Sequence, residues 1–141
     1  MVDEAENTAE ESKTVAEEKP SNIGKIEWMD LTVPDAGQLQ KFYTSVVGWS
    51  SNDVDMGSYS DFSLNLPGTE DTIAGVCHAR IGNANIPSQW LIYVRVASVV
   101  DSAQQCKKMG GEVLDGPRRM GGSNFCVIKD PAGAFMALLS D

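Results

Sequence analysis

The first clear pattern in the chain is an alternation of residue types between Lys25 and Val33, which predicts a β-strand. Successive side chains of a strand point to opposite faces, so one face is polar and aromatic and the other is apolar. The first face holds Trp28, Asp30 and Thr32, and the second holds Met29, Leu31 and Val33. We expect the apolar face to pack beneath the segment that follows.

That following segment has the spacing of an α-helix. Asp35 is a favourable N-cap residue, and Gly48 suits the left-handed position at which many helices end. Between them, apolar residues recur at i, i+3, i+4, i+7 and i+8, which predicts one buried stripe. The stripe consists of Leu39, Phe42, Tyr43, Val46 and Val47. We expect it to lie over Leu31 and Val33.

Three further short strands are predicted after this helix. They span about Trp49–Val54, Tyr59–Leu66 and Thr72–Arg80. The turn signals Met56-Gly57-Ser58 and Pro67-Gly68 separate them, because glycine and proline in such clusters interrupt regular structure. Residues 81–88 are rich in glycine, asparagine and proline, which is typical of a linker.

The second half of the chain repeats this order of elements. The stretch Trp90–Ser98 alternates like the first strand, and Ser98 is a suitable helix N-cap. The predicted buried stripe of its helix consists of Val99, Ala103 and Cys106, with Met109 as a further candidate. Three short strands follow, separated by a turn at Gly116-Pro117, a mobile loop at residues 120–122 and a tight turn at residues 130–133. The strands span Glu112–Leu114, Asn124–Lys129 and Phe135–Leu139.

The two halves align with each other without gaps from strand to helix cap. Placing Val33 against Val96 gives an offset of 63 residues, and the same offset places Asp35 against Ser98. The chain is therefore predicted to have an α+β fold built from two βαβββ modules. Module one covers about residues 24–80, a linker about 81–88, and module two about 89–141.

The first 23 residues differ in composition from the rest. They contain seven acidic and two basic residues and no aromatic residue, so they have almost nothing to bury. This composition predicts a disordered acidic tail ahead of the folded domain at 24–141.

Composition and charge exclude several classes of partner. The formal net charge is −9, whereas nucleic acids and anionic membranes attract basic surfaces. No run of about 18 apolar residues exists that could span a membrane. The three cysteines form no CxxC pair, which favours free thiols in a reducing compartment and hence a cytoplasmic location.

Several short motifs give the chain a family resemblance. The run Trp28-Met29-Asp30-Leu31-Thr32-Val33-Pro34-Asp35, then Phe42-Tyr43 and Val47-Gly48-Trp49, occur in the first half. The second half contains Met109-Gly110-Gly111-Glu112-Val113-Leu114-Asp115-Gly116-Pro117 and Asp130-Pro131-Ala132-Gly133-Ala134-Phe135. In this order the chain resembles the vicinal oxygen chelate superfamily of glyoxalases, bleomycin-resistance proteins and dioxygenases. The resemblance implies a curved mixed sheet in which the two modules form a cup.

The resemblance also implies where a divalent metal would be held. Three of the family's four ligand positions, on the first strand of each module and on the last strand, correspond here to Trp28, Leu91 and Ala137, and the fourth lies near Cys77-His78 on the fourth strand. The side chains at the first three positions offer a metal no useful nitrogen, oxygen or sulfur ligand, and a catalytic metal needs about three. We therefore expect no metal and no other cofactor. A different metal site built from Asp30, His78 and Tyr93 or Glu27 stays open as an alternative.

The remaining side chains predicted to face the cup suit an organic ligand, because they combine aromatic walls with a few polar groups. They are Trp28, Asp30 and Thr32 from the first strand, Tyr93 and Arg95 from the fifth, and Phe135 from the eighth. Asp30 and Arg95 are equally consistent with a cross-sheet ion pair. His78 is the only histidine, and it is a base candidate if it faces the cup rather than a strand end. Cys77 and His78 are neighbours on a strand, so only one of them can do so.

Three functions follow from these observations. The first is a metal-free protein that binds or sequesters a small organic ligand in the cup, as the bleomycin-resistance branch implies by resemblance. The second is a divergent lyase, isomerase or dioxygenase, either metal-assisted or with His78, Asp30 and Tyr93 as catalytic candidates. The third is an interaction protein that uses its acidic tail. The resemblance also makes a homodimer plausible.

Overall fold

The computed structural model describes residues 22–141, so nearly all of the predicted acidic tail lies outside the described residues. Module one contains β1 (Ile26–Val33), α1 (Ala36–Val47), β2 (Ser50–Asp55), β3 (Ser60–Asn65) and β4 (Thr72–His78). A short 3₁₀ helix, η3 (Ile81–Asn83), lies in the predicted linker. Module two contains β5 (Trp90–Arg95), α2 (Val99–Lys108), β6 (Glu112–Met120), β7 (Ser123–Lys129) and β8 (Phe135–Ser140).

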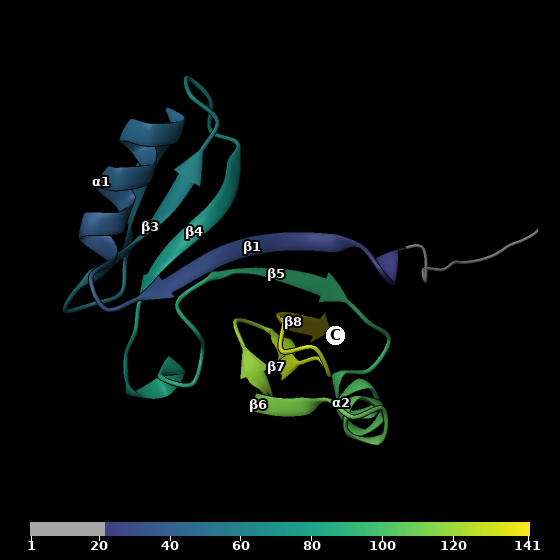
Figure 1. Ribbon diagram of the computed structural model, residues 1–141. Coiled ribbons are helices and arrows are strands. Elements are labelled where there is room, and N and C mark those ends of the chain that lie inside the picture. Colours follow the sequence, from purple (N-terminus) through teal and green to yellow (C-terminus); the bar gives the residue numbers. More distant parts are fainter. Residues whose placement is uncertain (1–21) are drawn as a thin grey trace, which may run out of the picture.

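All eight strands form one curved mixed sheet in the order β2-β3-β4-β1-β5-β8-β7-β6 (Figure 1). The first strand of each module pairs in parallel with the last strand of the same module, β1 with β4 and β5 with β8. The modules join where β1 and β5 pair antiparallel, at the centre of the sheet. The predicted α+β fold of two βαβββ modules is confirmed.

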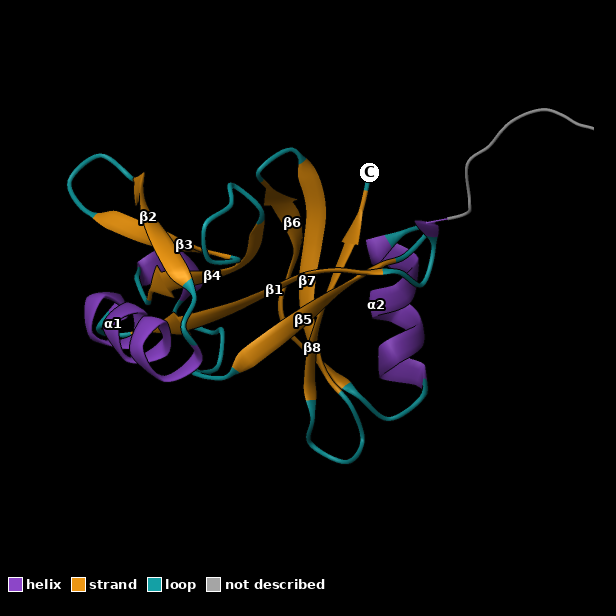
Figure 2. Ribbon diagram, turned by 90° about the horizontal axis from the view of Figure 1, so that it is seen from above, coloured by secondary structure: helices purple, strands orange, loops and turns teal. Residues whose placement is uncertain are grey.

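The two α-helices lie at opposite ends of the molecule (Figure 2). Both pack on the same face of the curved sheet, so its other face is not covered by an α-helix. The predicted caps are present, since the side chain of Asp35 accepts from the amide of Gln38 and Ser98 accepts from the amide of Asp101. Helix α1 packs mainly on β3 and β4, and α2 packs on β6, β7 and β8. We call the face away from the helices the inner face. Neither helix is long and apolar enough within residues 22–141 to cross a membrane.

The stripe of α1 that packs on the sheet is narrower than predicted. Leu31 and Val33 do pack against it, together with Ala36, Leu39 and Tyr43. Phe42 and Val46, however, are 52% and 65% exposed, and Val47 is half exposed, so their predicted burial is wrong. The reason is that α1 approaches the sheet along the fully buried Ala36, and this orientation turns the Phe42–Val46 row outward.

Strand β6 is longer than predicted, and this corrects the turn expected at Gly116-Pro117. The strand continues to Met120 while its pairing with β7 shifts register on either side of Asp115. Gly116 has φ +83°, and a β-carbon there would lie 2.5 Å from the carbonyl oxygen of Phe125. Only glycine therefore lets β6 stay this close to β7 at the irregularity. Gly121 and Gly122 join the two strands as a turn, and Met120, predicted to belong to this loop, is the last residue of β6.

The inner face differs between the modules. In module two it is filled by apolar side chains, to which Ile86 from the linker and Trp28 from β1 add. The buried members from the strands are Leu91, Tyr93, Phe125, Val127 and Ala137. In module one the inner face is open, which places the candidate site there.

Candidate functional site

A hollow of about 330 Å³ lies on the inner face of module one. All four strands of the module contribute to it, with side chains that are mostly apolar and a few that carry charge or a thiol. The lining residues are Trp28, Asp30, Val54, Met56, Asp61, Phe62, Ser63, Gly75 and Cys77.

The indole of Trp28 lies across strand β4 at Gly75. A β-carbon on Gly75 would lie 3.1 Å from Cζ2 of Trp28 and 3.5 Å from Cβ of Asp30. Such a distance is tighter than ordinary van der Waals contact, so a larger residue would displace the indole. The absence of a side chain at Gly75 therefore leaves room for the indole beside the hollow.

Asp30 lines this hollow beside Trp28, and two side chains donate hydrogen bonds to it. The hydroxyl of Tyr93 donates to Oδ1 at 3.0 Å and Oδ2 at 3.1 Å, and Nε1 of Trp28 donates to Oδ2 at 3.3 Å. Asp30 is only 9% exposed. Buried carboxylates are costly unless such donors compensate them, so the three residues form one unit.

Burial raises the pKa of Asp30 to about 6, and the nearby carboxylate of Asp61 raises it as well. The hydrogen bonds from Tyr93 and Trp28 act in the opposite direction and lower this pKa. Burial and the negative charge of Asp30 raise the pKa of the Tyr93 hydroxyl, so it remains a donor. Asp30 can therefore gain or lose a proton near neutral pH.

Cys77 and Asp61 complete the polar part of the hollow. Burial, with the charges of Asp30 and Asp61, raises the pKa of the Cys77 thiol to about 12. A thiol in this state is a poor nucleophile, because the thiolate is the reactive form. Oδ1 of Asp61 accepts from the backbone amide of His78 at 2.8 Å and lies 3.2 Å from its Nδ1, which holds the strand end in place.

The structure brings only part of the predicted site together. Trp28 and Asp30 line the hollow, and Tyr93 lies behind Asp30 with 2% of its surface exposed. Thr32 is buried further along β1 and does not line the hollow. Phe135 packs against the inner cluster of module two.

Arg95 is not part of the hollow, and it does not pair with Asp30. Its guanidinium makes two hydrogen bonds to Glu27, at 2.8 and 2.9 Å, and one to Asp141 at 2.8 Å. The alternative of an ion pair between Asp30 and Arg95 is therefore wrong. Arg95 lies at the far end of β5, where Glu27 is its near neighbour on β1, whereas Asp30 is paired with the opposite end of β5.

His78 lies at the end of β4, and it does not line the hollow. Its ring contacts Tyr59 and Phe62, at centroid distances of 5.7 and 6.4 Å. Cys77 faces the hollow instead, in agreement with the expectation that these neighbours point to opposite faces. This placement favours the strand-end interpretation of His78 over a role as base in the cup.

The lining residues that sequence reasoning missed include Val54, Met56, Asp61, Ser63, Gly75 and Cys77. The signal was available only in part. Alternation within β4 places Gly75 and Cys77 on one face. Only the pairing of Asp30 with Gly75 across β1 and β4 shows that this is the face of Asp30 and Trp28.

The residues at three of the family's four metal positions do not fit a divalent cation. Leu91 and Ala137 are fully buried in the apolar inner cluster of module two, against which Trp28 also packs. Side chains of this kind lack the donor atoms of a metal site. Within residues 22–141, no group of three or more His, Cys, Asp or Glu side chains is placed to hold a metal.

Comparisons with known proteins agree with this geometry at the level of the fold. The mycobacterial proteins named "Putative glyoxylase CFP32", from Mycobacterium bovis and Mycobacterium tuberculosis, are 29% identical over 121 residues. That alignment covers 82% of this chain but only 45% of theirs, so the chain spans about half the length of these relatives.

Solved structures of methylmalonyl-CoA epimerases share the fold. The enzyme from Mycobacterium tuberculosis matches with a TM-score of 0.51 and 14% identity, over 83% of this chain and 87% of that one. A variant from Streptomyces coelicolor, in complex with 2-nitronate-propionyl-CoA, matches with a TM-score of 0.52 and 18% identity, over 84% and 98%. The model of the glyoxalase/bleomycin resistance protein/dioxygenase superfamily matches residues 25–138. The chain therefore belongs to the glyoxalase/bleomycin resistance protein/dioxygenase superfamily.

Proposed function

We propose that this protein binds a small organic molecule in the hollow beside Trp28 and Asp30, without a divalent metal. The observation that carries the proposal is the pairing of an indole wall with the buried carboxyl group of Asp30 in a hollow of about 330 Å³. Sites for small molecules typically combine apolar walls with a few such orienting polar groups. Trp28, Leu91 and Ala137, at three of the family's four metal positions, offer a metal no lone pair, and this supports the metal-free part of the proposal.

The lining suggests the kind of ligand. Trp28, Val54 and Met56 offer an aromatic and aliphatic surface for an apolar body. Asp30 offers one hydrogen-bonding group whose character changes with pH, because its pKa is about 6. Above that pH it accepts hydrogen bonds from the ligand, and below it the carboxyl group also donates one.

Nuclear magnetic resonance of the indole N–H groups tests this proposal with an internal control. The chain has three tryptophans, and Trp49 and Trp90 pack in the core beneath α1, on the other face of the sheet. In a fragment library screened with EDTA present, ligands of the hollow should shift the Trp28 resonance and leave the other two in place. Assignment comes from the three Trp→Phe variants. A library in which every hit shifts Trp49 or Trp90 instead would refute the proposed location.

A second candidate function is proton transfer, with Asp30 as the acid–base residue. Its pKa near 6 is close to the range in which a carboxyl group exchanges protons efficiently at neutral pH. Tyr93 lies within 3.1 Å of both carboxylate oxygens and would steady the group during exchange. The substrate class would be a carbonyl compound with an acidic C–H bond, such as the methylmalonyl-CoA named for the structural relatives.

Hydrogen–deuterium exchange separates this enzyme from a binding protein. Methylmalonyl-CoA incubated in D₂O with the EDTA-treated protein should lose its α-proton signal if Asp30 acts as a base. Asp30→Asn should abolish that loss, whereas Asp71→Asn, an exposed carboxylate outside the hollow, should not. Exchange that is unaffected by Asp30→Asn would remove Asp30 from the reaction.

A further inference from the structure

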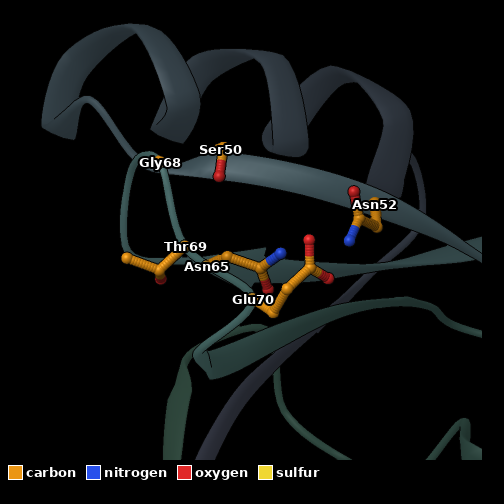
Figure 3. Close-up of a pocket in the computed structure, with 6 residues that line it drawn as sticks. All are labelled: Ser50, Asn52, Asn65, Gly68, Thr69 and Glu70. Atoms are coloured by element: carbon orange, nitrogen blue, oxygen red, sulfur yellow. The ribbon is translucent and has the colours of Figure 1, made fainter.

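A second hollow, of about 450 Å³, lies on module one where the β3–β4 loop meets the start of β2. Its lining contrasts with that of the first hollow, because it contains no aromatic or aliphatic residue. The lining residues are Ser50, Asn52, Asn65, Gly68, Thr69 and Glu70 (Figure 3). Ser50 and Asn65 are directly paired across β2 and β3, so both strands supply polar groups to one space.

Asn65 is the most informative of these residues. It is 2% exposed, and its Oδ1 accepts a hydrogen bond from the hydroxyl of Thr72 at 2.9 Å. No hydrogen bond to its amide nitrogen occurs within the part of the chain that the structure describes. A buried N–H donor without an acceptor is unfavourable, and this one lines the hollow. An acceptor atom on a bound molecule would satisfy it.

The other polar groups converge on the same space. Figure 3 shows the side-chain ends of Asn52, Asn65 and Glu70 directed toward one another from β2, β3 and the loop. Thr69 is less available, because its hydroxyl donates to the carbonyl of Leu66 and accepts from the amide of Asp71. Glu70 is the one charged residue of the lining.

The surrounding charge favours a cation. Residues 22–80 contain eight acidic and three basic residues, a net charge of −5, whereas residues 81–141 contain five acidic and six basic residues, a net charge of +1. The acidity of the described domain is therefore concentrated in the module that contains the hollow. A field of this sign raises the local concentration of cations and opposes the binding of anions.

We propose that this second hollow binds a small hydroxylated primary amine. The ammonium group would bind the carboxylate of Glu70, with Asn52 and Ser50 supplying further oxygen acceptors. A hydroxyl oxygen of the same molecule would accept from the amide nitrogen of Asn65. This chemistry needs both the charge of Glu70 and the buried donor, and it does not depend on what the first hollow binds.

Titration of the full-length protein with D-glucosamine tests this inference, with chemical shifts of the asparagine side-chain amides as the readout. The amide signals of Asn52 and Asn65 should shift on saturation. D-glucose, which lacks the ammonium group, should bind at least about tenfold more weakly. A tenfold difference in affinity corresponds to about 1.4 kcal/mol, and a hydrogen bond to a charged group contributes at least roughly that much.

Two variants distinguish the site from a general effect of charge. Glu70→Gln lies on an exposed loop and should weaken glucosamine binding by about tenfold or more. Asp71→Asn removes the same charge from the neighbouring exposed residue, which does not line the hollow, and should leave binding within about twofold. Absence of shifts at Asn52 and Asn65, equal binding of glucose, or equal losses in the two variants would each overturn the inference.

Discussion

Tyr93 donates its hydroxyl hydrogen bond to Asp30 across the junction of the two modules, and the two residues are 63 positions apart in the chain. That separation equals the offset at which the two halves of the sequence align, so the residues occupy equivalent positions in the two copies of the repeat. The contact at the centre of the sheet therefore joins the carboxyl group of Asp30 to the tyrosine hydroxyl at the equivalent position of module two. The hydrogen bond that links the two modules here therefore also positions Asp30, a polar residue of the candidate site.

Asp30 should make the folded protein less stable as the pH rises. Its pKa is about 6 in the folded protein and 3.8 ordinarily, so the folded state binds its proton more tightly. The resulting stabilisation is complete below about pH 4 and is lost as the pH rises through 6. The shift corresponds to about 3 kcal/mol at most. Urea unfolding should therefore show a loss of this size between pH 4 and pH 7.5 that Asp30→Asn lacks.

The comparison of wild type and Asp30→Asn at each pH cancels the contribution of other titrating groups. Asp35→Asn would not serve as the control, because Asp35 caps α1. Asp53→Asn is suitable, since Asp53 is exposed on β2. A wild type and an Asp30→Asn variant with parallel pH profiles would show that Asp30 titrates normally.

Tyr93→Phe should raise the pKa of Asp30 above 6. The lost hydroxyl donates to both carboxylate oxygens and so favours the charged form, and its removal favours the protonated form. At pH 7.5 we expect a loss of about 1–3 kcal/mol in the free energy of unfolding, because the buried carboxylate loses one of its two donors. A ¹³C titration of the Asp30 carboxyl carbon measures the shift. An unchanged or lower pKa would contradict the assigned hydrogen bond.

Gly75→Val should close the first hollow. The β-carbon alone would lie 3.1 Å from the Trp28 ring, so a branched side chain would push the indole into the space that a ligand needs. We expect ligand binding to fall by about tenfold or more and the protein to lose about 1–3 kcal/mol of stability from overpacking. Gly82→Ala is the matched control, because nothing lies within 4 Å of a β-carbon there. Unchanged binding in Gly75→Val would show that the ligand does not use the hollow beside Trp28.

Arg95→Gln should affect stability and leave ligand binding unchanged. Its guanidinium holds Glu27 in a two-point ion pair near the surface, which is worth about 1 kcal/mol. Arg95 also lowers the pKa of Glu27, so this contribution is present above the ordinary pKa of Glu27 and is lost as the pH falls below it. Chemical denaturation at pH 7.5 and pH 3 measures both effects. Weakened ligand binding in Arg95→Gln would instead show that Arg95 contributes to the binding site.

The effects of substitutions in and around α1 on the free energy of unfolding should match its narrow buried stripe. Phe42→Gln should change the free energy of unfolding by about 0.5 kcal/mol or less, because the ring is half exposed. Leu31→Ala should cost about 2–5 kcal/mol, since Leu31 is buried against the helix. A large loss in Phe42→Gln, measured by urea unfolding, would indicate that another surface covers α1 in solution.

The repeat and the order of elements could be predicted because both depend on local patterns. Alternation in the stretch before Pro34 and the spacing of helix residues are visible in short windows, and the second copy reinforces them. The caps at Asp35 and Ser98 were equally predictable and are confirmed. The strand through Gly116 was not, because glycine before proline indicates a turn unless the close approach to Phe125 is known.

The candidate site was predictable only on one strand. Trp28 and Asp30 share the inner face of β1 as expected, and that much follows from alternation. Their neighbours come from pairing between strands distant in sequence, which places Gly75 beside Asp30. The partners of Arg95 are Glu27 and Asp141, which lie 68 and 46 residues away in the chain. Long-range register of this kind leaves no local signature in one sequence.

The most direct test of metal-free binding in the first hollow is the Trp28 indole resonance in EDTA-treated protein during the fragment titration. We predict that ligands shift this resonance at saturation to the same extent with EDTA as with added Zn²⁺, Ni²⁺, Mn²⁺ or Fe²⁺. Shifts that appear only when one of these ions is added would contradict the claim.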